Sequence, residues 1–212
     1  MNSRDAILSK FPPLSGVGRA PVVSPLPRPL GVGDLAAEFT ARAAALQSTV
    51  ERVAALDDVP TAIAAYLARL GLAPQLVCWP GLAALPWSNA GLNAVARPAE
   101  DRDLVGVTQC FAAIAETGTL MMCSGRDTPA VTSLLPETHI AVVPIERLVG
   151  TLEAGFAALR RELGQPPRAV NLVSGPSRTG DIEQTITLGA HGPYRMHILL
   201  IDGAAAGTGG AL

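Results

Sequence analysis

The sequence predicts an α/β protein with a mostly parallel sheet flanked by helices. Short runs of almost entirely apolar residues recur along the chain, and segments with the apolar spacing of helices lie between them. Strands that are apolar on both faces are typical of a sheet that is covered on both sides, which is the usual setting of parallel strands. With 212 residues, 49% of them hydrophobic, the chain has enough apolar side chains for one such core.

The first helix is expected to begin after Gly33, where apolar residues recur on one face. The sequence leaves the end of this helix open. The periodicity continues to Leu56, which favours one long helix. However, residues 48–53 also favour a strand, so a helix that ends near Gln47 is equally defensible.

Two further helices are expected over residues 59–70 and 146–163. Pro60 suits the first turn of a helix, where the missing backbone N–H has no partner to lose. In the second segment, leucine and phenylalanine repeat at helical spacing, and Gly164 follows as a C-terminal cap.

Seven apolar runs are expected to supply strands of the sheet. They lie at 75–79, 91–96, 104–110, 119–123, 138–144, 169–173 and 196–201. In open α/β sheets, ligands bind outside the carboxyl ends of the strands. We therefore expect the functional residues in the loops that follow strands.

Residues 1–32 are expected to form an arm, residues 33–203 the folded domain and residues 204–212 a flexible tail. Six prolines lie between positions 12 and 29, where they exclude a regular helix and favour extended backbone. Two interpretations of the arm stay open. It is a mobile leader, or it docks on a partner or on a second copy of the chain in a homodimer.

The composition argues against several classes of function. The formal net charge is -2, so the basic surface typical of nucleic-acid binding is not indicated. No apolar run of about 18 residues is free of charges and helix breakers, so no membrane span is expected. The first residues lack the apolar core of a signal peptide. We therefore expect a cytoplasmic protein with no nucleic-acid partner.

The three cysteines, Cys78, Cys110 and Cys123, fit no metal or redox motif and are expected to be buried thiols. One chain needs four thiolates to hold an iron–sulfur cluster alone, so no such cluster is expected in this chain. The histidines show no ligand spacing, so no metal site is expected. The sequence identifies no other cofactor.

Glu116 lies in a polar turn between two apolar runs, in the segment AIAETGTL at 113–120. A carboxylate in such a segment is a candidate base, nucleophile or hydrogen-bond acceptor. Thr117 and Thr119, on either side of Gly118, would add hydroxyl groups. The structural alternative is that Glu116 caps backbone amides at a tight turn.

The segment SGPSRTGDIEQT at 174–185 follows an expected strand, and residues 181–188 are expected to form a short helix. Its small residues let backbone N–H groups turn toward an anion, and a helix N-terminus adds a favourable field. Arg178 can pair with a phosphate or a carboxylate. The structural alternative makes Asp181 the N-cap of the helix, with Gln184 completing a capping box. Both interpretations can hold together.

His191 lies just before the last strand, in the segment LGAHGP at 188–193. It can reach a site and titrate near neutral pH, or it is a turn histidine bonded to backbone. His139 and His197 lie beside or inside apolar strands and are expected to be partly buried and hydrogen-bonded. Residues 87–89 either line a pocket or close the edge of the core.

Together, the segments at 113–120, 174–185 and 188–193 and the apolar strand that ends at Asp202 resemble the LUD-domain family, in particular its lactate utilization C branch. Three separate motifs carry the resemblance, in order and over most of the chain. The resemblance implies a fold similar to that of the NagB/RpiA/CoA-transferase group. It also favours a strand at 49–53.

The resemblance implies an accessory role in oxidising L-lactate to pyruvate, beside iron–sulfur subunits that carry the clusters. The chain itself would bind a small anionic ligand or cofactor at the three motifs. An alternative is a stand-alone enzyme of the CoA-transferase, sugar-phosphate or folate type, with Glu116 as nucleophile or base and His191 as proton shuttle. A third hypothesis is an interaction protein that binds no ligand and docks through residues 1–32.

No catalytic residue of the family can be transferred, so the roles rest on inference and on analogy of fold. The catalytic candidates are Glu116 and His191. The ligand-binding candidates are Thr117, Gly118, Thr119, Ser174, Gly175, Pro176, Ser177, Arg178, Thr179, Asp181, Glu183 and Gly192.

Overall fold

A computed structural model describes residues 33–182, 185–189 and 192–203. The expected arm at 1–32 and the expected tail at 204–212 lie outside the described residues. So do Glu183 and His191 among the candidate site residues.

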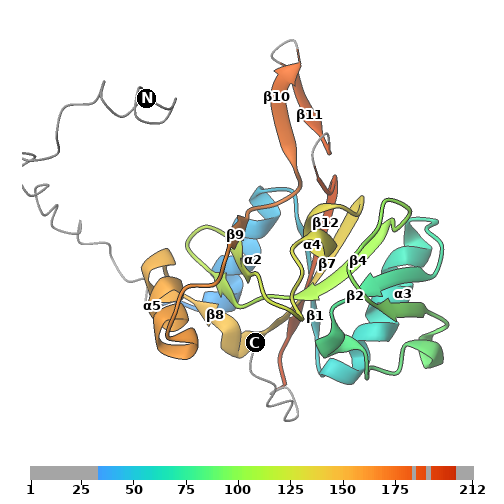
Figure 1. Cartoon of the computed structure of the whole chain (residues 1–212), viewed down its shortest axis with the longest axis horizontal. Helices are drawn as coiled ribbons and strands as arrows, with labels where there is room; N and C mark the ends of the chain where they lie inside the picture. The colour runs from blue at the N-terminus through green and yellow to red at the C-terminus, as the bar shows by residue number, and fades with distance from the viewer. Residues whose placement is uncertain (1–32, 183–184, 190–191, 204–212) are drawn as a thin grey trace, which may run out of the picture. The chain divides into compact units, whose positions relative to one another are not determined.

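The centre of the described domain is a six-stranded sheet in the order β1-β12-β7-β4-β2-β3, and every neighbouring pair is parallel (Figure 1). Its strands are β1 (Thr49–Val53), β2 (Gln75–Cys78), β3 (Asn93–Ala96), β4 (Val105–Gln109), β7 (Thr138–Pro144) and β12 (Arg195–Ile201). The predicted α/β class with a mostly parallel sheet is therefore confirmed. The apolar run at 138–144 forms β7 residue for residue.

A second, four-stranded sheet has the order β8-β5-β6-β9. Its strands are β5 (Ala112–Ile114), β6 (Thr119–Cys123), β8 (Leu148–Val149) and β9 (Val170–Val173). The short strand β5 pairs antiparallel with β6 and parallel with β8. Sequence analysis did not identify β5 as a separate strand, because it is only three residues long.

The α-helices in the described residues are α2 (Leu35–Ala45), α3 (Val59–Arg69), α4 (Val131–Leu134) and α5 (Leu152–Leu163). Short 3-10 helices cover Leu56–Asp58, Pro80–Leu82, Trp87–Ala90 and Ile145–Arg147. Among these described helices, none is both long and apolar enough to cross a membrane.

The elements form layers. Helix α3 covers one face of the central sheet, and its Ile63 and Leu67 pack with strand residues such as Val107. The other face packs against α2 and the four-stranded sheet. Helix α5 covers the outer face of that second sheet, where Leu159 packs near Met121 (Figure 1). The central sheet is thus covered on one side partly by a sheet and not by helices alone.

The end of the first helix, which the sequence left open, lies at Ala45. Gln47 adopts a positive φ of 68°, which breaks the helical path, and the chain then enters β1. Strand β1 pairs in parallel with β12, so residues 49–53 gain a full ladder of hydrogen bonds there. Tertiary pairing therefore decides between the two local preferences.

The helix expected over residues 146–163 begins only at Leu152, so the first part of that prediction is wrong. Leu148 lies in β8, where it pairs with Ala113 of β5. Thr151 starts the helix, because its hydroxyl accepts a hydrogen bond from the Ala154 N–H at 3.2 Å. The apolar spacing of Leu148 matched a helix by coincidence.

The short helix expected at 181–188 is also wrong. The chain forms an antiparallel hairpin of β10 (Arg178–Ile182) and β11 (Thr185–Leu188), which stands away from the two sheets (Figure 1). Alternation of threonine with isoleucine and leucine favours a strand at 185–188. Asp181 therefore cannot serve as a helix N-cap.

Candidate functional site

The motif segments meet at one place, which we call the motif junction: residues 116–119, 174–178, 189 and 192–193. The hydroxyl groups of Thr119 and Ser174 share a hydrogen bond of 2.7 Å. The Ser177 N–H donates to the Pro193 carbonyl at 2.8 Å, and the Gly189 N–H donates to the Ser177 carbonyl at 2.9 Å. Segments that are far apart in sequence are thus joined at the base of the hairpin.

The motif junction lies at the amino ends of the central strands and not outside their carboxyl ends, where the fold class favours a ligand site. The Tyr194 N–H donates to the Glu137 carbonyl, immediately before β12 and β7 begin. The segment at 174–178 does follow a strand, as predicted. That strand is β9 of the second sheet, so the rule for the central sheet does not apply to it.

Two motif glycines bring the junction against the end of α2. Gly118 and Gly175 have positive φ values of 65° and 82°. A side chain at Gly118 would lie 2.7 Å from the Arg42 carbonyl carbon, and one at Gly175 would overlap the Leu46 carbonyl oxygen. Both positions therefore require glycine for conformation and for space.

Arg178 stabilises the same helix end. Its Nη2 donates to the Leu46 carbonyl at 3.1 Å and to Gln47 Oε1 at 2.9 Å. Leu46 is the C-cap of α2, where the helix carbonyls attract a positive charge. In this structure the guanidinium thus serves the fold, while it remains exposed to solvent.

The side chain of Glu116, in the turn between β5 and β6, lies beside the first residue of α5. Its Oε1 accepts a hydrogen bond from the Leu152 N–H at 2.9 Å, and its own N–H donates to the Gly150 carbonyl at 3.1 Å. A carboxylate is favoured beside the unpaired N–H groups of a helix N-terminus. The side chain is half-buried. This contact agrees with the structural alternative, although the capped amide belongs to α5 and not to the turn of Glu116 itself.

Replacing Glu116 is expected to weaken the start of α5. Glu116→Ala should lower the free energy of unfolding by about 1 kcal/mol, and Glu116→Gln by less, because the amide oxygen still accepts the Leu152 N–H. Urea denaturation measures both. Glu146→Gln, at an exposed carboxylate in the preceding 3-10 helix, is the matched control and should leave the free energy of unfolding unchanged. Equal values for all three variants would contradict this role.

The remaining candidate residues divide between the junction and the hairpin. A side chain at Gly192 would lie 3.2 Å from Ser177 Cβ, so the two residues are close neighbours. Thr117 is exposed, whereas Pro176 and Thr179 are buried. Asp181 lies within β10. Because His191 is not described, the structure does not test its approach to Glu116.

Two other histidines are buried on opposite faces of the central sheet. His139 shares a 2.8 Å hydrogen bond with Thr108, and His197 shares one of 2.8 Å with Thr49. The Tyr66 ring stacks on His197 with centroids 3.9 Å apart. Each histidine leaves its second ring nitrogen without a hydrogen-bond partner. Both histidines are buried more deeply than the partial burial that the sequence predicts, and each makes a hydrogen bond through only one ring nitrogen.

Desolvation keeps the imidazole rings of His139 and His197 neutral at pH 7. Burial lowers the pKa of His139 to about 4. Burial, together with the nearby positive charge of Arg69, lowers the pKa of His197 to about 4 as well. The Glu51 carboxylate lies 3.6 Å from His197 Nε2, but its side chain is 42% exposed, and burial still lowers the pKa of His197.

The cysteines are buried and unpaired, as predicted. Burial raises the pKa of Cys78 and Cys123 to about 11 and that of Cys110 to about 12, so the thiols are not activated as nucleophiles. Trp87 is also buried, and its indole N–H donates to the Leu82 carbonyl at 2.9 Å. Trp87 thus belongs to the core, whereas Ser88 and Asn89 are exposed. In the described part of the chain, no group of three or more His, Cys, Asp or Glu residues could hold a metal ion.

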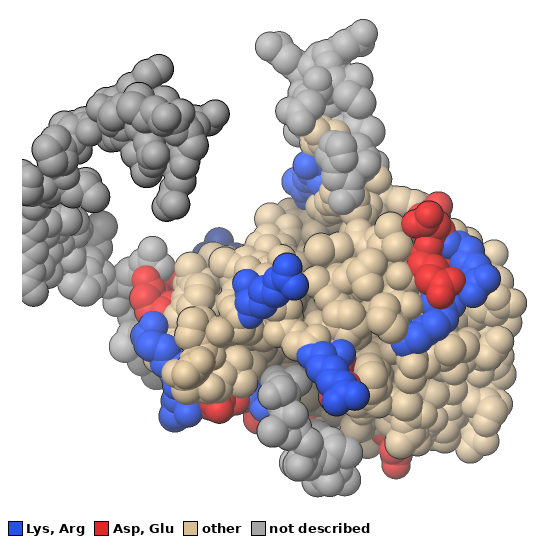
Figure 2. Space-filling view, viewed as in Figure 1, with Lys and Arg blue, Asp and Glu red and all other residues tan. Residues whose placement is uncertain are grey.

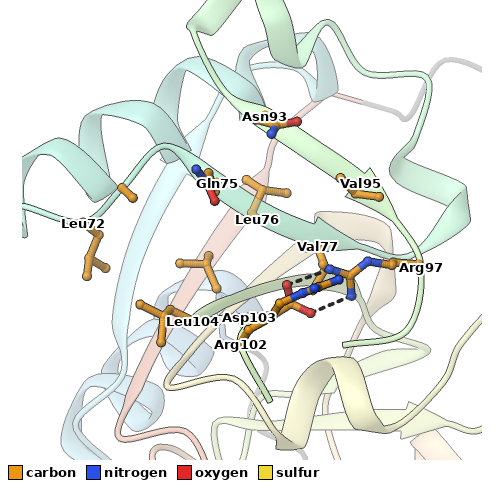
Figure 3. Close-up of a pocket in the computed structure, with 12 residues that line it drawn as sticks. Leu72, Gln75, Leu76, Val77, Asn93, Val95, Arg97, Arg102, Asp103 and Leu104 are labelled. Atoms are coloured by element: carbon orange, nitrogen blue, oxygen red, sulfur yellow. Dashed lines mark hydrogen bonds and ion pairs between the residues drawn. The ribbon is translucent and has the colours of Figure 1, made fainter. Parts of the chain in front are cut away.

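A hollow of about 280 Å³ lies at the β3 edge of the central sheet. It is lined by β2, β3 and the segment that leads into β4 (Figure 3). Sequence analysis missed it, because its walls come from separate segments that carry no shared motif. On the face shown in Figure 2, charged side chains are scattered over a largely uncharged surface. Acidic and basic residues adjoin each other over the side that carries β2, where residues 97–103 form ion pairs.

Comparisons with known proteins agree with this architecture. Residues 36–201 match the family model of the LUD domain. The chain is 30% identical over 184 residues to lactate utilization protein C of Deinococcus radiodurans, and the match covers 84% of each chain. It is 31% identical over 129 residues to lactate utilization protein C of Bacillus licheniformis, covering 58% of this chain and 53% of that protein. The match thus spans only about half the length of the latter relative.

A solved structure also resembles the chain. It is the crystal structure of a DUF162 family protein from Deinococcus radiodurans, with a TM-score of 0.60 and 27% sequence identity. The match covers 79% of this chain and 96% of that one. Family model, relatives and solved structure agree with the resemblance seen in the three motifs, and the chain belongs to the LUD domain family.

Proposed function

We propose that this chain is an accessory protein of an L-lactate oxidation system and acts beside partner subunits that carry iron–sulfur clusters. The observation that carries the proposal is the match over 84% of the chain to a relative named lactate utilization protein C. The cysteine count supports this division of labour, because three thiols cannot supply the four ligands of a cluster. The unpaired thiols suit a reducing compartment such as the cytoplasm.

The motif junction is the proposed ligand site, and a small anion is the proposed ligand. Ser174 is exposed there beside buried Thr119, and the exposed guanidinium of Arg178 lies on the same segment. Hydroxyl groups and a guanidinium are suitable donors to a carboxylate or phosphate. An anion that engages Arg178 would compete with its contacts to the end of α2. Ligand binding would thus be coupled to the position of that helix.

The hairpin of β10 and β11 is the proposed contact for a partner subunit. It extends from the motif junction away from both sheets (Figure 1). In the described residues β10 and β11 pair as strands only with each other, so each has an outer edge that no described strand covers. Such edges are templates for strand addition by a partner.

Growth on L-lactate tests the function. Deleting the gene in a strain without another lactate dehydrogenase should abolish growth on L-lactate but not on pyruvate, and the intact gene should restore it. A variant with residues 179–187 replaced by a short Gly-Asn turn should fold but fail to restore growth and fail to co-purify with the cluster-bearing subunits. Unimpaired growth of the deletion strain would overturn the proposal.

The same growth assay distinguishes an accessory role from the alternative in which Glu116 is catalytic. Glu116→Gln should restore growth nearly as well as the intact gene if Glu116 only caps α5. If Glu116 acts as a nucleophile or base, this variant should fold but lose function. The second result would favour a stand-alone enzyme or a catalytic subunit.

A further inference from the structure

Strands β2 and β3 leave part of the central sheet uncovered. Gln75 and Val77 of β2 lie on the face of the sheet opposite α3, and they pair in register with Asn93 and Val95 of β3. Val77 is buried, but Val95 is 43% exposed. The four-stranded sheet lies over the opposite half of the central sheet (Figure 1). A partly exposed face, here carrying Gln75, Asn93 and Val95, is unusual in a parallel sheet, which is normally covered on both sides.

The connection from β3 to β4 folds back beside this face and forms a fixed wall. Arg97 donates to both carboxylate oxygens of Asp103, at 2.6 and 2.8 Å, and to the Pro98 carbonyl at 2.9 Å. The Glu100 N–H donates to the same Asp103 carboxylate at 2.7 Å. Hydrogen bonding to Arg97 lowers the pKa of Asp103, so the pair persists at neutral pH. The hollow is therefore preformed.

The lining combines apolar walls with two amides. Leu72, Val95 and Leu104 supply apolar surface, and Leu104 is 47% exposed. Gln75 and Asn93 lie directly opposite each other in the strand register, so both amides stand on one side of the hollow (Figure 3). Each amide offers a donor and an acceptor.

The charges beside the hollow are already compensated. Arg97 pairs with Asp103, and Arg102 pairs with Glu100 at 2.8 Å. The hollow therefore does not call for an anion, unlike the motif junction. Its volume of about 280 Å³ is at the small end for ligand sites, so the ligand is about the size of one ring system with a substituent.

We propose that this hollow binds an uncharged planar nitrogen heterocycle, such as the base of a nucleoside. The ring would lie between Val95 and Leu104, and Asn93 and Gln75 would hydrogen-bond its polar edge. Paired donors and acceptors on an amide match the edge of such a ring, as in the reading of adenine by Asn and Gln. This site is separate from the motif junction and does not depend on the function proposed above.

Titration of the full chain with adenosine, uridine and nicotinamide tests the proposal. Ribose and benzyl alcohol are the controls for the sugar and for a ring without polar nitrogen. At least one heterocycle should bind with a dissociation constant of 1 mM or lower, estimated from roughly 4 kcal/mol of affinity. Isothermal titration calorimetry and NMR line broadening measure binding directly.

Variants place the ligand in the hollow. Asn93→Leu and Gln75→Leu should each weaken binding about tenfold, since a hydrogen bond contributes about 1.4 kcal/mol. Val95→Trp should fill the hollow and abolish binding. Asn89→Leu changes an exposed amide in another segment and is the matched control. Because Gln75, Asn93 and Val95 are all exposed, the variants should fold, and circular dichroism checks this.

Three outcomes would overturn the proposal. The first is that no heterocycle binds at 10 mM, a concentration set at about ten times the expected dissociation constant. The second is that benzyl alcohol binds as tightly as the heterocycles, which would indicate an apolar cleft without edge recognition. The third is that the hollow variants bind like Asn89→Leu, which would place the ligand elsewhere.

Discussion

Lowering the pH from 7 to 4.5 is expected to reduce the free energy of unfolding by several kcal/mol, because two buried histidines resist protonation in the folded chain. His139 and His197 are each 1% exposed, and burial lowers the pKa of both to about 4. In the unfolded chain their pKa is about 6.5. The unfolded state therefore takes up protons first as the pH falls.

The sign follows from linkage. A histidine with a lowered pKa contributes stability that is fully present above about pH 6.5 and is lost as the pH falls toward 4. Each group changes the free energy of unfolding by up to about 1.4 kcal/mol per pH unit in that window. Together, His139 and His197 contribute on the order of 5 kcal/mol across it, which approaches the whole stability of a typical domain.

Urea denaturation at pH 7, 6, 5 and 4.5 measures this dependence. His139→Gln keeps a polar atom near Thr108, and His197→Asn keeps one near Thr49, so both variants preserve the observed hydrogen bonds as far as an amide can. Each should be less stable than the natural chain at pH 7 and should lose less stability on acidification. Parallel pH profiles for the natural chain and both variants would show that other groups cause the acid sensitivity.

The elements that the sequence predicts well are those with one dominant local signal. Residues 138–144 are nearly all apolar and form β7 with the predicted bounds. Pro60 and Gly71 bracket α3 closely, because proline and glycine act through backbone conformation alone. In each case no distant partner is needed to decide the structure.

The elements that the sequence mispredicts depend on distant partners. Leu148 has helical spacing but pairs with β5. Residues 185–188 form a strand because β10 is available to pair with them. The local spacing of apolar residues carries no information about either pairing strand, so it cannot decide between helix and strand.

The candidate site shows the same limit. The motif residues were found from the sequence, but their contacts were not. Arg178 and Gly175 both act on the end of α2, more than 120 positions earlier in the chain. The sequence does not predict the hollow near Val95. Its walls come from β2, β3 and the connection at 97–104, which lie side by side only in the folded chain.

Gly118→Ala is expected to cause one of the largest losses of stability of any single substitution in the described domain. The alanine would have to adopt a φ of 65°, which costs about 1 kcal/mol. Its Cβ would also lie 2.9 Å from the Ala43 Cα and 2.7 Å from the Arg42 carbonyl carbon. These atoms belong to the backbone of α2, so they cannot yield without moving the helix.

Gly164→Ala separates the two effects. Gly164 has nearly the same φ, 67°, but no atom lies within 4 Å of an added Cβ. Gly164→Ala should therefore lower the free energy of unfolding only by the conformational cost of about 1 kcal/mol. Gly118→Ala should lose roughly 3–5 kcal/mol, because the clash with buried backbone adds to that cost. Urea denaturation of both variants gives the comparison.

The difference between the two glycine variants has a functional consequence. If Gly118→Ala displaces the end of α2, Arg178 should lose its contacts with Leu46 and Gln47. The proposed anion binding at the motif junction and growth on L-lactate should then fall together, whereas Gly164→Ala should leave both intact. Equal losses of stability in the two variants would show that α2 yields easily, and that the close approach of the ETGT turn to this helix does not hold the junction together.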